Sequence, residues 1–314
     1  MKTNNIVHAA LFGVAVGDAL GVPAEFTSRS TLQANPVVDF EGYKSHNHPP
    51  GTFSDDSSLT FCLAESLCKG YDLEDIATRF LMWRDEDYWT AHGEVFDIGN
   101  TTHYALNNLK SGIPPALSGG FEESENGNGS LMRILPLAFY IRQFDIEKRF
   151  EIVKEVSSIT HGHIQSVVSC FYYLEFALEL LKGNSKQTAY QNTAGTVLDF
   201  ITNKGIDQRQ INLFAPLLKE DISRLPMHHI SSTGYVMSTL PAAMYCLLTT
   251  SNYKEAVIKA VNMGDDTDTT AAVAGGLAGL YYGFESIPEK WRNELARSND
   301  IYDLCTRLAA AMNL

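Results

Sequence analysis

The chain has 314 residues, of which 45% are hydrophobic and 19% charged, so it can form one large core and is not expected to be disordered. Its net charge of −13 argues against a nucleic-acid-binding surface, because such a surface needs clustered Lys and Arg to neutralise phosphates. The five cysteines are scattered without C-x-x-C spacing, which argues against a disulfide framework and favours a reducing compartment. No apolar run is predicted to cross a bilayer, and we expect a cytoplasmic protein with no membrane partner.

Apolar residues recur at helical spacing along most of the chain. Leu59, Leu63 and Leu67, for example, are four residues apart in a stretch that Gly70 closes. Alternating apolar and polar residues are nearly absent, so few strands are expected. No linker-like composition divides the chain, so residues 1–314 are predicted to form a single all-α domain. Its predicted helices cover residues 5–20, 56–69, 73–84, 101–110, 130–143, 146–159, 165–182, 235–248, 253–263, 268–282, 289–297 and 302–312, with a less regular stretch before residue 235.

The predicted helix over residues 268–282 contains an unusual number of small residues, in the run A-A-V-A-G-G-L-A-G at 271–279. Glycine lowers helix propensity, so its repeated use needs a compensating gain. Close packing of this helix against a second helix would provide one.

The first helix ends at residues 17–25, G-D-A-L-G-V-P-A-E, which place Glu25 just beyond it. A loop glutamate is usually an exposed residue without a special role. Glu25 becomes a candidate general base only if the fold brings it near other site residues that hold a reactive water.

Two acidic clusters, far apart in the sequence, each follow a glycine-containing loop and open into a helix. They are S-D-D-S at residues 54–57 and D-D-T-D-T at 265–269. Either cluster alone is most simply explained as a helix N-cap. A cap needs only one such residue, however, and both clusters repeat carboxylates. If they meet, they cannot all stay ionised without a cation, and oxygen-only ligands favour magnesium or manganese.

Three further motifs carry polar groups that could contact a substrate. Asp97 precedes a predicted helix and could pair with a cationic group or simply belong to a loop. The glycine-rich residues 126–130 come before the predicted helix over 130–143, where free N–H groups would bind an anion such as a diphosphate. His161 and His163 have no third His or Cys at zinc-like spacing, so zinc is not favoured.

Together these motifs resemble the ADP-ribosylglycohydrolase family, and in particular the bacterial enzymes that remove ADP-ribose from a modified arginine of dinitrogenase reductase. The similarity spans nearly the whole chain. It rests on the order and spacing of residues 17–25, 54–57, 97–102, 127–133, 160–161 and 264–269. The resemblance implies an all-helical enzyme that holds two magnesium or manganese ions.

The resemblance also implies roles for individual residues. The implied metal ligands are Ser54, Asp55, Asp56, Asp266, Asp268 and Thr269. The implied catalytic residues are Glu25, Asp55 and Asp56. The implied substrate-binding residues are Asp97, on the arginine side, and Gly127, Asn128, Gly129, Ser130, Met132, His161 and Tyr235, on the ADP-ribose side. It gives no role to Asp265 or His163.

The sequence therefore predicts a metal-dependent hydrolase that cleaves the bond between ADP-ribose and a protein side chain, most simply arginine, and releases ADP-ribose. We expect direct attack by a metal-activated water, with Glu25 or a ligand aspartate taking its proton. One alternative is a hydrolase of the same fold that acts on O-linked ADP-ribose, on serine or in O-acetyl-ADP-ribose, or on nucleic-acid adducts. Another is a catalytically silent ADP-ribose-binding protein.

Overall fold

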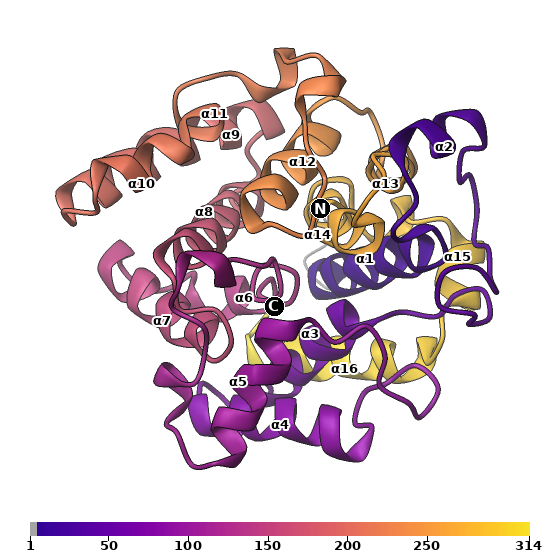
Figure 1. The fold of residues 1–314 in the computed structure, drawn as a ribbon, viewed down its shortest axis with the longest axis horizontal. Coiled ribbons are helices and arrows are strands. Elements are labelled where there is room, and N and C mark those ends of the chain that lie inside the picture. Colours follow the sequence, from indigo (N-terminus) through magenta and orange to yellow (C-terminus); the bar gives the residue numbers. More distant parts are fainter. Residues whose placement is uncertain (1–4) are drawn as a thin grey trace.

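Helices make up the regular structure of the computed structural model, which describes residues 5–314 (Figure 1). The all-α prediction is confirmed, because strands are absent from this part of the chain and only two isolated bridges join its loops. The α-helices are α1 Ile6–Gly21, α2 Arg29–Ala34, α3 Asp55–Leu67, α4 Leu73–Glu86, α5 Asn100–Lys110, α6 Leu137–Ile141, α7 Ile146–Ser158, α8 Ile164–Leu181, α9 Lys186–Asn203, α10 Gln208–Leu213, α11 Ala215–Leu218, α12 Val236–Leu248, α13 Tyr253–Val261, α14 Thr267–Tyr282, α15 Glu289–Glu294 and α16 Ser298–Ala311.

Helices α1 and α14, from opposite ends of the chain, lie side by side at the centre of the fold (Figure 1). Their contact is close because glycines face backbone across the interface. A Cβ atom on Gly17 would lie 2.1 Å from the carbonyl oxygen of Ala271, and one on Gly279 would lie 1.9 Å from that of Ala9. The predicted close approach of the small-residue helix is therefore confirmed. It brings the end of α1 to the start of α14.

The Gly17→Ala variant should be strongly destabilised, because its added methyl group meets backbone that cannot move away. We expect the free energy of unfolding to fall by about 3 kcal/mol, the upper end of the range for overpacked cores. Urea denaturation measures this loss. Gly195→Ala is the matched control: it lies within α9 with nothing within 4 Å of an added Cβ, so alanine should stabilise that helix slightly. Equal stability of the two variants would contradict the close α1–α14 contact.

The predicted helix over residues 130–143 is wrong in its first half. The chain runs through turns until α6 begins at Leu137. Two features disfavour a helix here. The guanidinium of Arg133 binds the Gly129 carbonyl, which a helix would pair with the Arg133 amide, and Pro136 has no amide hydrogen to donate. The less regular stretch before residue 235 contains α9, whose apolar positions are separated by many polar residues.

Two helical stretches, Ile6–Ala24 and Ile164–Leu181, are long and apolar enough to span a membrane, contrary to the expectation from the sequence. Within the fold 94% and 83% of these segments are buried, so protein packing accounts for their apolar composition.

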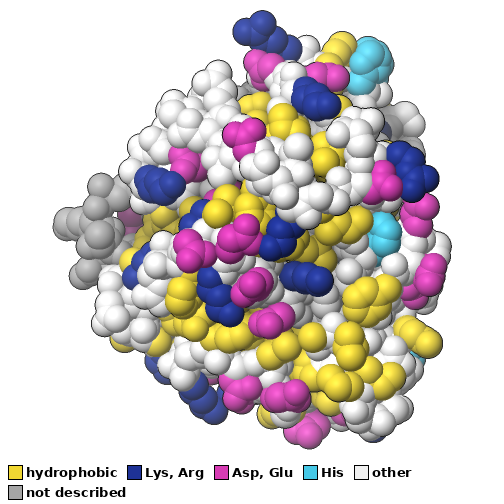
Figure 2. Space-filling model, turned by 90° about the vertical axis from the view of Figure 1, so that its left-hand side faces the viewer, with side chains coloured by type: hydrophobic (Ala, Val, Ile, Leu, Met, Phe, Trp, Pro, Cys, Tyr) yellow, Lys and Arg dark blue, Asp and Glu magenta, His cyan; other side chains and the backbone are white. Residues whose placement is uncertain are grey.

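Figure 2 shows the side of the molecule that lies to the left in Figure 1. Several basic side chains on that side lie beside acidic ones. The ion pairs of the described chain include Lys204–Glu147 and Arg149–Glu175.

Candidate active site

A cavity of about 800 Å³ opens where the loops at the ends of several helices converge. Ten of the residues singled out from the sequence line it: Glu25, Asp55, Asp97, Gly127, Asn128, Gly129, Met132, His161, Asp266 and Thr269. Its wall also includes the turn into α5, from Ile98 to Thr102, which belongs to the motif over residues 97–102 but received no individual site roles. Residues that are distant in the sequence therefore share one concave site.

The two acidic clusters meet at the floor of this cavity. The Asp56 carboxylate accepts hydrogen bonds from Ser54 Oγ, at 3.0 Å, and from Thr269 Oγ1 at the start of α14, at 3.3 Å. Asp56 and Asp268 are each 1% exposed and lie beneath the lining residues. The predicted convergence of the front and back clusters is thus present in the structure.

Capping explains only part of this arrangement. Ser54 caps α3, since its hydroxyl accepts from the Asp56 amide. Asp266 is the N-cap residue of α14, but its side chain makes no capping hydrogen bond and instead accepts from Asn128 Nδ2 at 2.7 Å. One acidic cluster therefore begins its helix conventionally, whereas the other directs the carboxylate of its N-cap residue, Asp266, into the site.

Asp18 is a member of the cluster that the sequence interpretation did not assign. It lies on α1, is fully buried, and accepts from the Ser54 amide at 3.0 Å and from the Ser57 hydroxyl at 2.5 Å. Burial raises its pKa to about 6, and hydrogen bonds from these serines oppose that rise. Asp18 thus fixes the first turn of α3 against α1. Its signal in the sequence was a single carboxylate within an apolar helix.

The cluster has the features of an incomplete cation site. Burial is the main cause that raises the pKa of Asp55, Asp56 and Asp268 well above its usual value, and neighbouring carboxylates raise it further. One buried oxygen on each of Asp56, Asp266 and Asp268 has no hydrogen-bond partner. Buried polar atoms normally have partners, so these three oxygens are available to bind a ligand.

The donor atoms fit a divalent cation. Oxygens of Asp18, Asp56 and Asp268 lie within 4.8 Å of one another, and so do oxygens of Glu25, Asp266 and Asp268. All are hard carboxylate oxygens, which magnesium and manganese prefer. A bound cation would give the unpartnered oxygens a ligand and allow the carboxylates to remain ionised.

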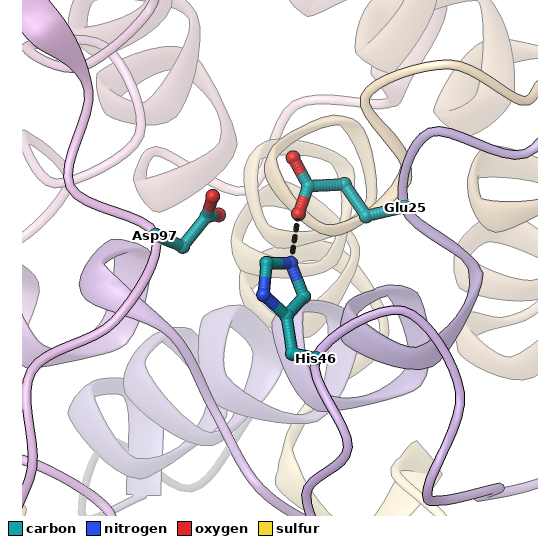
Figure 3. Close-up of side chains that lie close together, drawn as sticks. All are labelled: Glu25, His46 and Asp97. Carbon is teal, nitrogen blue, oxygen red and sulfur yellow. Dashed lines mark hydrogen bonds and ion pairs between the residues drawn. The ribbon is translucent and has the colours of Figure 1, made fainter.

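Glu25 and Asp97 face each other at the edge of the cluster, with His46 beside them (Figure 3). His46 Nε2 forms a hydrogen bond with Glu25 Oε2. Burial raises the pKa of Glu25 to about 8, with a further contribution from Asp266. Burial likewise raises the pKa of Asp97 to about 8, and the adjacent Glu25 adds to the effect. The sequence interpretation missed His46, because nothing in its loop indicated a position next to Glu25.

The glycine-rich loop forms the opposite wall. Its Asn128 amide donates to the Gly234 carbonyl at 3.1 Å, and the Val236 amide donates to Asn126, so two loops pair backbone to backbone. Asn128 Nδ2 also links this wall to the cluster through Asp266. The expected helix N-terminus at Ser130 is absent, so a helix dipole does not contribute to anion binding at this point.

His161 supports the glycine-rich loop from behind. A Cβ atom on Gly129 would lie 2.8 Å from the His161 ring, so the close approach requires glycine. Burial lowers the pKa of His161 to about 3, with help from the charge of Arg133, so the ring is neutral. His161 Nδ1 is hydrogen-bonded to Thr160 Oγ1 at 2.8 Å. This histidine can orient the loop but does not carry a charge at neutral pH.

Three residues from the sequence motifs lie away from the cavity wall: Ser130 and Tyr235, which had implied substrate-binding roles, and His163, which had none. Ser130 is fully buried and bonded to Ser157 Oγ at 3.0 Å, so its hydroxyl does not line the cleft. Tyr235 is 40% exposed, and its hydroxyl donates to Gln165 Oε1 at 2.5 Å. His163 accepts from Asn126 Nδ2 at 2.7 Å and holds the glycine-rich loop to α8. Asp265 lines the cavity and bonds through its backbone to Phe26 and Thr27.

The sequence of this chain is similar to those of several known ADP-ribosyl hydrolases. The chain is 32% identical to the ADP-ribosylarginine hydrolase Tri1 of Serratia proteamaculans over 95% of its length and 77% of the relative's. It is 33% identical to the Tri1 protein of Pseudomonas putida, over 95% of this chain and 76% of that one. The ADP-ribosyl-[dinitrogen reductase] glycohydrolase of Rhodospirillum rubrum is 27% identical over 91% of this chain and 88% of the relative.

A solved structure described as an ADP-ribosylglycohydrolase-related protein complex superposes with a TM-score of 0.82, at 28% identity and with 99% of each chain covered. The family profile named ADP-ribosylglycohydrolase matches residues 2–314. This match spans both acidic clusters and the whole cavity wall. The chain therefore belongs to the ADP-ribosylglycohydrolase family.

Proposed function

We propose that this protein hydrolyses the N-glycosidic bond between ADP-ribose and a modified arginine of a protein substrate, with two divalent cations, magnesium or manganese, in its acidic cluster. The observation that carries the proposal is the pair of carboxylates, Glu25 and Asp97, at the edge of that cluster. A guanidinium is a planar cation that carboxylates bind well. The names of two relatives, both ADP-ribosylarginine hydrolases, support the arginine linkage.

The cavity has a suitable size and wall for ADP-ribose. Its volume of about 800 Å³ is within the range of about 300–1,000 Å³ that is usual for small-molecule sites. The Gly127–Gly129 loop leaves room for a ligand next to its backbone, and Met132 provides an apolar contact. With the ADP portion of the ligand against this loop, the distal ribose would lie over the carboxylates and the modified side chain would lie near Asp97.

The cluster carboxylates, Glu25 and Asp97 each have a separate role in the proposed reaction. A divalent cation held by the carboxylates of the cluster would lower the pKa of a bound water and so supply a nucleophile at neutral pH. As the water oxygen bonds to the anomeric carbon, Glu25 takes up the proton that is released, the bond from that carbon to the guanidinium nitrogen breaks, and the arginine leaves with the electron pair of that bond. Burial raises the pKa of Glu25 to about 8, so its ionised form, which nearby cations would favour, is a stronger base than that of an ordinary glutamate. Asp97 binds the guanidinium and keeps the leaving group in position.

A panel of ADP-ribosylated substrates tests the proposal. Release of ADP-ribose from arginine, serine, O-acetyl and nucleic-acid linkages would be compared with magnesium, with manganese and with excess chelator. We expect arginine to be cleaved fastest, and only when metal is present. Preferential cleavage of another linkage would contradict the arginine assignment. Tight ADP-ribose binding without cleavage of any linkage would identify a binding protein instead.

The Asp97→Asn variant should lose activity selectively. We expect kcat/KM for ADP-ribosyl-arginine to fall about 100-fold or more, because the buried guanidinium loses its charged partner. Any activity on a neutral O-linked substrate should change less than about fivefold. Asp87→Asn is the matched control, since Asp87 is also an aspartate with a left-handed backbone, φ 55° against 59° for Asp97, but is exposed elsewhere on the surface. Equal losses on both linkages would argue against a contact with guanidinium.

A further inference from the structure

Within residues 5–314, His46 is the one side chain outside the predicted site residues that forms a hydrogen bond with the carboxylate of the candidate base, Glu25 (Figure 3). We propose that His46 is a positioning residue, which holds the Glu25 carboxylate in the orientation that accepts a proton and keeps it apart from Asp97. The inference rests on the proposed function, because it assigns His46 a part in the same reaction. It is carried by three contacts of the loop between α2 and α3.

The first contact fixes the loop itself. Ser45, the residue before His46, donates through Oγ to the backbone oxygen of Glu25 at 2.7 Å and to that of Pro23 at 3.1 Å. Its amide also donates to Pro23 at 3.3 Å. The backbone that carries His46 is therefore attached to the turn that carries Glu25. These hydrogen bonds of Ser45 hold the side chains of His46 and Glu25 next to each other.

The second contact is the hydrogen bond between His46 Nε2 and Glu25 Oε2. It engages one carboxylate oxygen, and Figure 3 shows the other Glu25 oxygen directed away from the imidazole. Both side chains are largely buried, with exposed fractions of 16% for His46 and 7% for Glu25. A hydrogen bond in such surroundings restricts rotation of the carboxylate more than an exposed one would.

The third contact joins the two segments that bear the facing carboxylates. The ring of His46 lies 5.9 Å, centroid to centroid, from Phe26, which follows Glu25. It lies 5.2 Å from Phe96, which precedes Asp97. His46 therefore packs between the two segments and sets the spacing of their carboxylates. When both carboxylates are ionised, Glu25 and Asp97 repel each other, and the packed ring of His46 opposes their separation.

Three substitutions at His46 separate positioning from simple packing. Glutamine can place an amide nitrogen near the position of Nε2, whereas asparagine reaches only the position of Nδ1. We expect His46→Ala and His46→Asn to lower kcat about 10- to 100-fold with KM changed less than about threefold, as when the partner of a site residue is removed. His46→Gln should retain at least about a third of kcat. Similar losses in all three variants would overturn the proposal.

His48→Ala is the matched control. The ring of His48 also packs on Phe96, with centroids 4.3 Å apart, but its Nε2 faces Glu94 at 3.5 Å and not Glu25. We expect kcat within about twofold of wild type for this variant. A loss as large as that of His46→Ala would mean that aromatic packing, and not the bond to Glu25, is responsible.

A double-mutant cycle shows whether His46 acts through Glu25. Glu25→Gln should slow turnover strongly. Adding His46→Ala to Glu25→Gln should then change kcat by less than about twofold, because no carboxylate remains to be positioned. Independent, multiplying losses would overturn the inference. The cycle is measured on whichever linkage the wild-type protein cleaves fastest, so a failure of the arginine assignment leaves the test intact.

Urea unfolding of the same four proteins gives a readout that does not depend on turnover. We expect the effects of the His46→Ala and Glu25→Gln changes on unfolding to be coupled. Additive effects would overturn the proposed contact even if the wild-type protein cleaves no linkage in the panel. Absence of turnover together with coupling would contradict the proposed function and support only the positioning of Glu25.

Discussion

Replacing Asp56 with asparagine is expected to lower turnover by about 1,000-fold or more and, in metal-free protein, to raise the stability of the fold. Asparagine keeps the size of the side chain but removes the buried carboxylate of Asp56, whose Oδ1 has no hydrogen-bond partner. Loss of a cation ligand would cost several kcal/mol of transition-state stabilisation. Removing one of several adjacent buried carboxylates should stabilise the protein by about 1–2 kcal/mol near pH 8. Turnover in saturating manganese and unfolding in chelator measure the two effects.

A lower turnover together with a higher stability of the metal-free protein distinguishes a metal ligand from a structural residue. Replacing a structural residue would lower both turnover and stability. Asp265→Asn is a control from the same loop region of the site: Asp265 is exposed, and asparagine tolerates its left-handed backbone, φ 61°. We expect that variant to remain within about threefold of wild-type activity. If Asp56→Asn kept more than about a tenth of the turnover in saturating metal, Asp56 would not be a ligand.

Removal of metal should make the stability of the protein fall as pH rises. In the folded state the pKa of both Glu25 and Asp97 is raised to about 8, above the value of about 4 of an unfolded carboxyl group. Their stabilising contribution is present below the unfolded pKa and is lost as pH rises through the folded pKa. In excess chelator, we expect the unfolding temperature to drop by roughly 5–10 °C between about pH 5.5 and pH 8.

Added magnesium or manganese should abolish or reverse this trend, because cations replace the bound protons. Thermal unfolding at several pH values, with metal and with chelator, tests both expectations. A surface carboxylate such as Asp39 does not contribute to the fall: the hydrogen bond from Lys290 lowers its pKa to about 2, so it stays ionised throughout. A metal-free stability that did not change with pH would contradict the repulsion described for the cluster.

The sequence predicted the all-α fold and the meeting of the acidic clusters because these features leave local signals. The run of small residues at 271–279 indicated a close helix pair, and the repeated carboxylates exceeded what capping requires. The turns around Arg133 were not predictable from periodicity, because a side chain there takes the carbonyl that a helix would use. Helix α9 was missed since polar residues interrupt its apolar face.

The position of His46 shows a different limit. Neither its loop nor its neighbours carry a pattern that indicates Glu25 as a partner, and the contact depends on the Ser45 bonds to the Pro23–Glu25 turn. Asp18 left a weaker signal, a lone carboxylate in an apolar helix, whose meaning depends on where α3 begins. Such residues are recognised once the loops are placed, because their roles come from tertiary hydrogen bonds.

The pairing of α1 with α14 has a consequence for biosynthesis. Helix α1 leaves the ribosome well before α14, and nearly all its side chains are apolar and buried in the finished fold. Its main partner, α14, is translated only after the helices from α2 to α13. A nascent chain must therefore keep α1 covered by temporary contacts or by a chaperone until α14 has been synthesised. Truncation before α14 should accordingly yield an aggregating product and not a smaller folded unit.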